Sequence, residues 1–78
     1  MSKFADRLRL LRHEKGLSQS ELSRILGRVS KSSVNMYERG EREPSFAVLV
    51  AIADYFDVDT DYLLGRTEIP RQLRARQD

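Results

Sequence analysis

Four glycines divide the sequence into short segments, and this spacing restricts the fold more than any other feature. Each one follows a stretch whose apolar residues are spaced as on a helix: Gly16, Gly27, Gly40 and Gly65. Glycine is the preferred residue just after a helix, where the chain turns left-handed. Helix starts are marked as well, most clearly by the capping box from Ser18 to Glu21. We therefore expect five helices, at residues 3–15, 19–26, 31–39, 46–56 and 60–64, and no strand.

A chain of 78 residues forms at most one small domain. The segment 46–56 is apolar almost all round, which predicts a buried helix at the centre of the core. The expected fold is all-α, a compact five-helix bundle within residues 1–65. The basic tail 66–78 has three possible forms: a disordered end, a linker, or a short C-terminal helix after Pro70.

The composition excludes several kinds of site. There is no cysteine and one histidine, His13, so we expect no disulfide, metal centre or cofactor. Asp57, Asp59 and Asp61 have the spacing of calcium ligands, but Tyr62 stands where that loop needs glycine. Asp59 fits better as a helix cap. No base, orienting acid and oxyanion site come together, which argues against an enzyme.

The longest apolar run has eight residues, 46–53, against the roughly 20 of a membrane span. We expect a soluble, cytoplasmic protein that associates with the nucleoid and not with a membrane. The net charge is only +2, but residues 1–43 carry +4 and residues 44–65 carry −4. Such polarity can present a basic face to a polyanion, although ordinary solvated helices would explain it equally well.

The second and third predicted helices, with the brief turn between them, form a candidate helix-turn-helix. In this motif one helix crosses the phosphate backbone and the next enters the major groove. The outward face of residues 31–39 is rich in hydrogen-bonding groups, and four residues are candidates for reading bases: Lys31, Ser32, Asn35 and Met36. Four more are candidates for contacting phosphates: Gln19, Arg28, Arg39 and Arg42. The alternative is that all of these are ordinary solvated residues.

Two charged residues stand on apolar helix faces. Arg12 follows Leu8 by four residues, and Glu38 follows Val34 by four. Because a buried charge needs a partner, we predict that Arg12 and Glu38 form an ion pair between the first and third helices. Otherwise, Arg12 extends past the apolar stripe into solvent.

An ordered set of short motifs resembles the Cro/phage-repressor (XRE) helix-turn-helix family over about residues 7–65. The motifs are Gly16-Leu-Ser-Gln19, Glu21-Leu22, Val29-Ser30, Tyr37-Glu-Arg-Gly40, Glu43-Pro-Ser45, Ile52-Ala53 and Asp61-Tyr-Leu-Leu-Gly65. The resemblance implies a repressor of bacterial or phage origin that binds double-stranded operator DNA, usually as a homodimer on a palindrome. It assigns base reading to Lys31, Ser32 and Met36 and phosphate contacts to Gln19 and Arg39, and it also implies the pair of Arg12 with Glu38.

The sequence departs from the family pattern in two places. The turn holds one extra residue, placed at Arg28, and Ser23 stands where alanine is usual. The extra residue can shift the third helix relative to the second. Which residues of the third helix read bases therefore depends on this turn.

The junction of the last two helices has more apolar side chains than a small domain easily buries. As candidate contacts with a second copy we take Tyr55, Val58, Tyr62 and Leu63. The family also forms its dimer contact at this end of the molecule, but these residues could equally close the core of one chain.

The predicted function is sequence-specific transcriptional regulation. Two alternatives are an antitoxin that binds a toxin protein, and an adaptor that has the fold without DNA binding.

Overall fold

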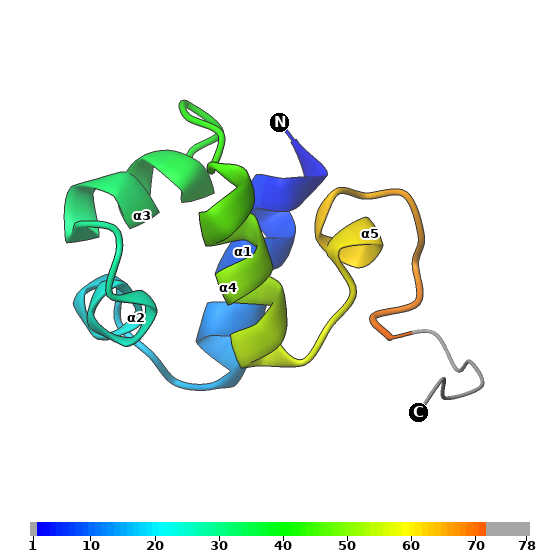
Figure 1. Ribbon diagram of the computed structural model, residues 1–78, viewed down its shortest axis with the longest axis horizontal. Helices are drawn as coiled ribbons and strands as arrows, with labels where there is room; N and C mark the ends of the chain where they lie inside the picture. The colour runs from blue at the N-terminus through cyan, green and yellow to red at the C-terminus, as the bar shows by residue number, and fades with distance from the viewer. Residues whose placement is uncertain (1, 72–78) are drawn as a thin grey trace.

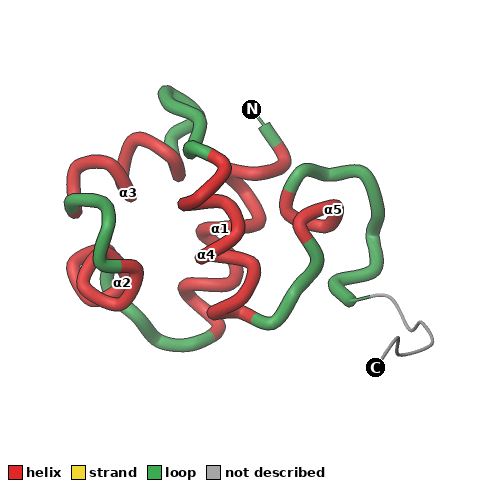
Figure 2. Tube along the Cα trace, in the orientation of Figure 1, coloured by secondary structure: helices red, strands yellow, loops and turns green. Residues whose placement is uncertain are grey.

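Five helices joined by short connections form the part of the chain that the structure describes (Figure 1). The computed structural model describes residues 2–71. The helices are α1 (Lys3–Glu14), α2 (Gln19–Leu26), α3 (Lys31–Glu38), α4 (Phe46–Phe56) and α5 (Thr60–Leu63). Residues 2–71 contain no strand (Figure 2). The all-α prediction is therefore confirmed, and each helix bound lies within one residue of the expected position.

The four longer helices all begin at a serine whose hydroxyl caps the first turn. These serines are Ser2, Ser18, Ser30 and Ser45, and each side chain accepts the N–H of the third helical residue. At Ser18 the capping box is complete, because Glu21 in return accepts the N–H of Ser18 at 2.8 Å. A cap of this kind contributes about 1 kcal/mol to helix stability. Asp59 occupies the cap position of α5, but its side chain does not make the capping hydrogen bond.

The core lies between α1, α4 and the pair α2 and α3, and α5 closes one end (Figure 1). Five large side chains are completely buried in it: Leu8, Leu22, Val34, Ile52 and Leu63. The α3 helix contacts both α1 and α2 and so has a firm support. One face of α3 is therefore held by the core while the other faces outward.

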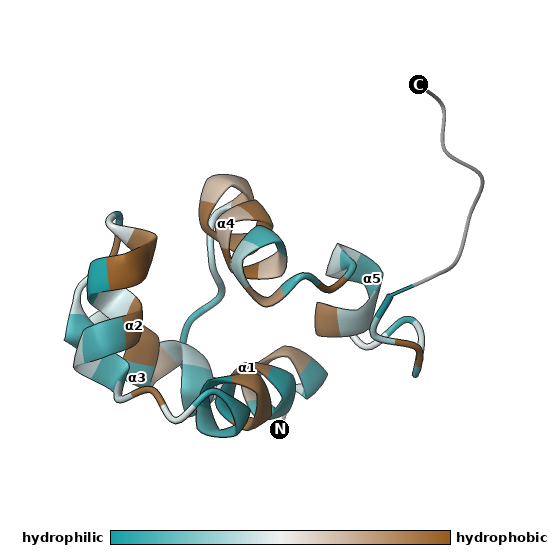
Figure 3. Cartoon of the chain, turned by 90° about the horizontal axis from the view of Figure 1, so that it is seen from below, coloured by the Kyte–Doolittle hydropathy of each residue, from teal (hydrophilic) through white to brown (hydrophobic). Residues whose placement is uncertain are grey.

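The prediction that α4 is a buried helix at the centre of the core holds for only one of its sides. Phe46 is 89% exposed and Val50 49% exposed. Phe46 and Val50 stand one turn apart on α4. Figure 3 shows that one side of α4 is not covered by another helix. The physical reason is that four other short helices suffice to cover only one side of α4, on which Val48, Ile52 and Phe56 are buried.

The segment 66–71 folds back against α1 and α5. The Arg7 guanidinium donates to the carbonyl oxygens of Tyr62 and Thr67 and to the carboxylate of Glu68. The N–H of Asp59 donates to the carbonyl of Pro70 at 2.8 Å. The short C-terminal helix considered for the tail would lie outside the described residues. Within residues 2–71, no helix has the length and apolar character needed to cross a membrane.

Candidate nucleic-acid interface

The turn between α2 and α3 takes up four residues, 27–30, and its geometry explains how the extra residue is accommodated. Gly27 ends α2 with a left-handed φ of 72°, which suits glycine. Val29 packs against the core, and Ser30 caps α3. Arg28 remains exposed between them. The additional residue is therefore absorbed in a turn that is anchored at both ends.

The outward face of α3 carries the predicted base-reading residues. Lys31 and Ser32 are exposed, while Asn35 and Met36 are half-buried. On the inner face, Val34, Tyr37 and Glu38 are buried. Gln19 at the start of α2 joins Lys31, Ser32 and Asn35 around a shallow depression of about 360 Å³. The start of α2 and the first half of α3 thus present one continuous polar surface.

An ion pair attaches α3 to α1, where the sequence predicts one. Arg12 Nε lies 2.6 Å from Glu38 Oε2, and Arg12 Nη2 lies 2.9 Å from Glu38 Oε1. The two side chains are 12% and 3% exposed, and Arg12 Nη1 also donates to the carbonyl of Leu17 at 2.7 Å. The hydrogen bond with Glu38 raises the pKa of Arg12 above its ordinary value, although burial acts in the opposite direction. Removing either partner would leave a buried charge without compensation.

A chain of hydrogen bonds continues from this ion pair to the outward face of α3. Gln19 Nε2 lies 3.2 Å from Glu38 Oε1 and 3.2 Å from Asn35 Oδ1. A carboxylate only accepts hydrogen bonds, so the Gln19 group facing Glu38 must be the amide NH₂. That NH₂ in turn needs an acceptor at Asn35, which must be its oxygen. The negative charge on Glu38 therefore determines the orientation of the Asn35 amide: its oxygen faces Gln19, and its NH₂ group faces the opposite way.

These hydrogen bonds bear on the predicted contact of Gln19 with a DNA phosphate. Both hydrogens of its NH₂ group point to acceptors within the protein, Glu38 and Asn35. In this arrangement the NH₂ group of Gln19 donates within the protein, and its contact with a phosphate stays a prediction. The first N–H groups of α2 have no partner within the helix and remain candidates for such a contact.

The three predicted phosphate-contacting arginines surround α3 but are held differently. Arg28 is exposed on the turn. Arg39 follows the last residue of α3 and lies 3.0 Å from a carboxylate oxygen of Glu41. Arg42 folds back so that Nη1 lies 3.4 Å from Ser33 Oγ. The structure therefore places basic groups at both ends of α3.

The candidate dimer contacts divide into two pairs. Leu63 has no exposed surface and Tyr62 is 9% exposed, so both close the core of a single chain and the proposed contact is corrected for them. Tyr55 and Val58 are half-buried and pack against the edge of the core. The Arg7 guanidinium also covers the Tyr62 ring, 4.1 Å from its centroid. Tyr55 and Val58 therefore remain as candidates.

Sequence reasoning missed two further features. The link from Gln19 to Asn35 joins residues 16 positions apart in the sequence, and helical spacing carries no signal for it. Arg7 lies within α1 as an ordinary polar position, and its bonds to residues 62–68 depend on the return of the chain after α5. Both features could be found only from the packing of helices on one another.

Comparison with known proteins gives one consistent result. Residues 8–63 match the HTH_3 family model, described as helix-turn-helix. The HTH-type transcriptional regulator AnsR of Bacillus subtilis is 44% identical over 61 residues, which cover 78% of this chain and 52% of AnsR. The uncharacterized regulator YobD of the same organism is 37% identical over 67 residues, covering 86% of this chain and 59% of YobD. The chain thus spans little more than half the length of these relatives.

Solved structures show the same similarity. The P22 c2 repressor in complex with a synthetic operator superposes with a TM-score of 0.74 at 31% identity, covering 78% of this chain and 91% of the repressor chain. The restriction-modification controller protein C.AhdI of Aeromonas hydrophila gives a TM-score of 0.70 at 39% identity, covering 80% of this chain and 92% of the controller chain. These matches cover about four fifths of this chain and are therefore not confined to the two helices of the motif.

Proposed function

Because the chain belongs to the helix-turn-helix family, we propose that it binds double-stranded DNA with sequence specificity and regulates transcription, acting as a repressor by occupying its operator. The relatives named as transcriptional regulators and the P22 c2 repressor, whose structure contains an operator, support this proposal. It places the protein in the cytoplasm with the chromosome. Residues 1–65 act as the DNA-binding domain, and residues 66–78 follow as a basic tail whose first part, 66–71, lies against this domain.

The observation that carries the proposal is the firm attachment of an outward polar helix. The inner side of α3 is fixed by the core and by the ion pair of Arg12 with Glu38. Its outer side carries Lys31, Ser32, Asn35 and Met36, and basic residues stand at both ends. A major groove admits one α-helix, and side chains on its exposed face reach the base edges. Rigid support of these side chains lowers the entropic cost of binding.

The fixed amide of Asn35 refines the base preference. Its oxygen accepts from Gln19, so its NH₂ group lies on the side away from Gln19 and is left as a donor. Donors pair with the acceptors of the major groove, which are O6 and N7 of guanine, N7 of adenine and O4 of thymine. Lys31 stands one turn before Asn35 and prefers the same guanine acceptors. We therefore expect the half-site to present acceptors, guanine foremost, to these two residues.

The phosphate contacts are assigned to the first N–H groups of α2 and to three arginines: Arg28, Arg39 and Arg42. Such contacts set affinity and orientation without reading the sequence. For Arg39 this requires release of the exposed pair with Glu41, which costs little because surface ion pairs contribute about 0–1 kcal/mol. The protein binds as a homodimer on a palindromic operator, and Tyr55 and Val58 are its candidate contacts.

Selection of bound sites from a random DNA library tests this function. We expect a palindrome whose half-sites lie about one helical turn apart. On the selected duplex, Lys31→Ala should reduce discrimination at one base pair by about 1–3 kcal/mol. Arg39→Ala should weaken binding to all duplexes alike. Equal losses from both variants on every duplex would contradict the division into reading and positioning residues.

The adaptor alternative makes a different prediction for salt. Affinity that depends on phosphate contacts falls steeply as ionic strength rises. A flat response, or failure to enrich any duplex, would favour a protein partner. The exposed face of α3 argues against the adaptor, because it carries Lys31, Asn35 and Arg39 where a protein interface would have apolar anchors. An antitoxin would bind DNA and in addition form a stable complex with a toxin protein.

A further inference from the structure

Glu38 is the only charged residue among positions 2–71 that is buried, and its carboxylate bonds to side chains of two other helices. It binds Arg12 of α1 through both oxygens. Oε1 also accepts from Nε2 of Gln19, the first residue of α2, and the same Nε2 lies 3.2 Å from Oδ1 of Asn35. Asn35 stands one turn before Glu38 on α3 and lines the shallow depression beside Lys31. A buried charge is thereby connected to a side chain at the outward surface.

Each amide in this chain of hydrogen bonds passes on its polarity. A side-chain amide carries a donor NH₂ on one side and an acceptor oxygen on the other. The Glu38 carboxylate only accepts, so Gln19 presents its NH₂ and Asn35 presents its oxygen in return. A donor at position 38 would turn both amides round, and the outward group of Asn35 would then be its oxygen. The described part of the chain holds no buried side-chain nitrogen or oxygen without a partner, so no unpaired group competes for these bonds.

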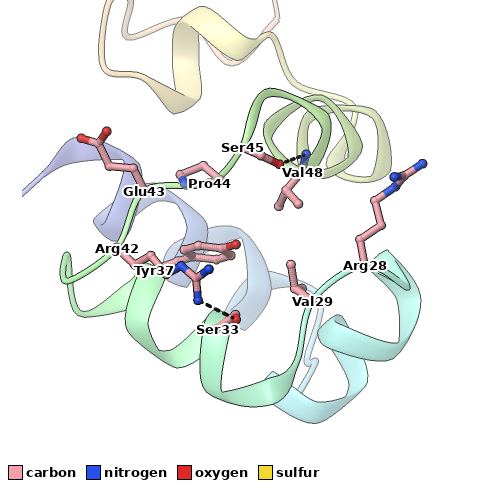
Figure 4. Close-up of a pocket in the computed structure, with 9 residues that line it drawn as sticks. All are labelled: Arg28, Val29, Ser33, Tyr37, Arg42, Glu43, Pro44, Ser45 and Val48. Carbon is pink, nitrogen blue, oxygen red and sulfur yellow. Dashed lines mark hydrogen bonds between the residues drawn. The ribbon is translucent and has the colours of Figure 1, made fainter.

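The opposite flank of α3 is separate from these hydrogen bonds. A pocket of about 530 Å³ lies there, between α3, the turn before it and the start of α4 (Figure 4). Ser33 and Tyr37 line this pocket from α3, whereas Glu38 does not. Among residues 2–71, the Glu38 carboxylate bonds only to Arg12 and Gln19. The connection from Glu38 to the outward face of α3 therefore runs through Gln19.

We propose that Glu38 determines which class of base the protein reads, although its side chain, 3% exposed, is too deeply buried to touch DNA. Acting through Gln19, its negative charge makes Asn35 present a donor to the major groove. This inference rests on the proposed function, and it makes Glu38 a positioning residue as well as the partner of Arg12. An outward donor suits O6 and N7 of guanine, whereas an outward oxygen suits the amino groups of cytosine and adenine. The preference at this base pair is therefore set from inside the core.

Exchange of side-chain amide protons with water, followed by NMR of the isotopically labelled protein, tests the orientation without DNA. In the unchanged protein we expect slow exchange for the NH₂ of Gln19, which donates twice, and fast exchange for the NH₂ of Asn35. Glu38→Gln keeps the shape of the side chain. Its oxygen should stay on Arg12 Nε, where the bond is shortest, so that its new NH₂ faces Gln19. The slow exchange should then move from Gln19 to Asn35. Slow exchange that stays at Gln19 in the folded variant would overturn the proposal.

Binding to duplexes with each of the four bases in turn at the pair that Asn35 contacts tests the effect on reading. That pair is identified as the one at which Asn35→Ala loses its preference. The unchanged protein should prefer guanine to cytosine there by about tenfold. Glu38→Gln should favour cytosine or adenine instead. A loss of stability alone would weaken binding but would not reverse this preference.

Gln19→Met removes the connection but leaves the ion pair of Arg12 with Glu38 in place, so it decides the question if Glu38→Gln does not fold. It should lose the preference at that pair and keep its preferences elsewhere. Arg24→Gln, an exposed change on the same helix, should read bases as the unchanged protein does. The proposal is overturned if either Gln19→Met or Glu38→Gln, when folded, keeps the preference for guanine. If no duplex is bound, the proposed function fails, whereas the exchange measurement still decides whether Glu38 orients Asn35.

Discussion

Replacing Arg12 by methionine tests whether the ion pair with Glu38 supports α3 as the structure indicates. Methionine keeps the length and the apolar part of the arginine side chain but removes the guanidinium. The Glu38 carboxylate, 3% exposed, then loses two bonds of 2.6 and 2.9 Å and its only cation within hydrogen-bond distance among residues 2–71. Breaking a buried pair in this way typically costs about 3–5 kcal/mol. A domain of this size has a total stability of about 4–12 kcal/mol, so the variant should be close to unfolding.

Urea unfolding followed by circular dichroism gives the free energy of unfolding for each variant. With a slope of about 1 kcal/mol per molar urea, the expected loss shifts the midpoint by about 3 M or abolishes the folded baseline. Arg9→Met is the matched control on α1, because the Arg9 side chain is 44% exposed and forms only an exposed pair with Asp6 at 3.3 Å and a long bond to the backbone carbonyl of Glu38 at 3.4 Å. That control should lose no more than about 1 kcal/mol.

The double variant Arg12→Met/Glu38→Leu separates the charge effect from a general defect. It removes both charges and fills the space with apolar groups, and buried pairs replaced in this way often lose little stability. We expect the double variant to be about 2 kcal/mol more stable than Arg12→Met alone, because residues in contact interact with energies of this size. A loss below about 1 kcal/mol in Arg12→Met, or a double variant as unstable as the sum of its single variants, would refute the reasoning.

Three further variants test other features. The bond from the Ser18 N–H lowers the pKa of Glu21 below its ordinary 4.5. The ionised Glu21 carboxylate therefore stabilises the fold above pH 4.5, and this contribution is lost as the pH falls through the lower pKa of the folded state. Thermal melts of Glu21→Gln at several pH values should lack this part of the acid destabilisation. Asn35→Asp keeps the bond from Gln19 but replaces the outward NH₂ with a negative oxygen, so its affinity for the selected duplex, read by fluorescence anisotropy, should fall at least about tenfold; equal affinity would contradict the assigned orientation. Gly65→Ala should melt at a lower temperature than Gly27→Ala, because both have positive φ but only at Gly65 would a Cβ meet Lys3 Cβ, at 2.7 Å.

Most of the fold could be predicted because its signals are local. Serine caps and glycine ends act within one helical turn, and the apolar spacing of α1 and α2 marks the faces that are buried. The pairing of Arg12 with Glu38 was also within reach, since a charge on an apolar face implies a partner. The pattern failed at α4, where apolar composition does not say how many neighbours are available to cover a helix.

The functional surface was predictable in its residue types but not in its connections. Helical spacing identifies Lys31, Ser32, Asn35 and Met36 as neighbours on one face. It cannot show that Gln19 donates to Asn35, since this depends on the crossing of α2 and α3 after the longer turn. The same holds for the pocket between α3, the turn before it and the start of α4, which appears only once α4 is placed against α3.

The return of residues 66–71 along α1 and α5 has a practical consequence. This segment and α3 lie at opposite ends of the long axis of the molecule (Figure 1). A fluorophore or surface tether attached at Arg71 would therefore leave the α3 side clear for whatever is being titrated. A mechanical load applied through that point would first strain the bond of Arg71 with Asp57 and the bond of the Asp59 N–H with Pro70, and then those of Arg7, all far from the two helices of the motif.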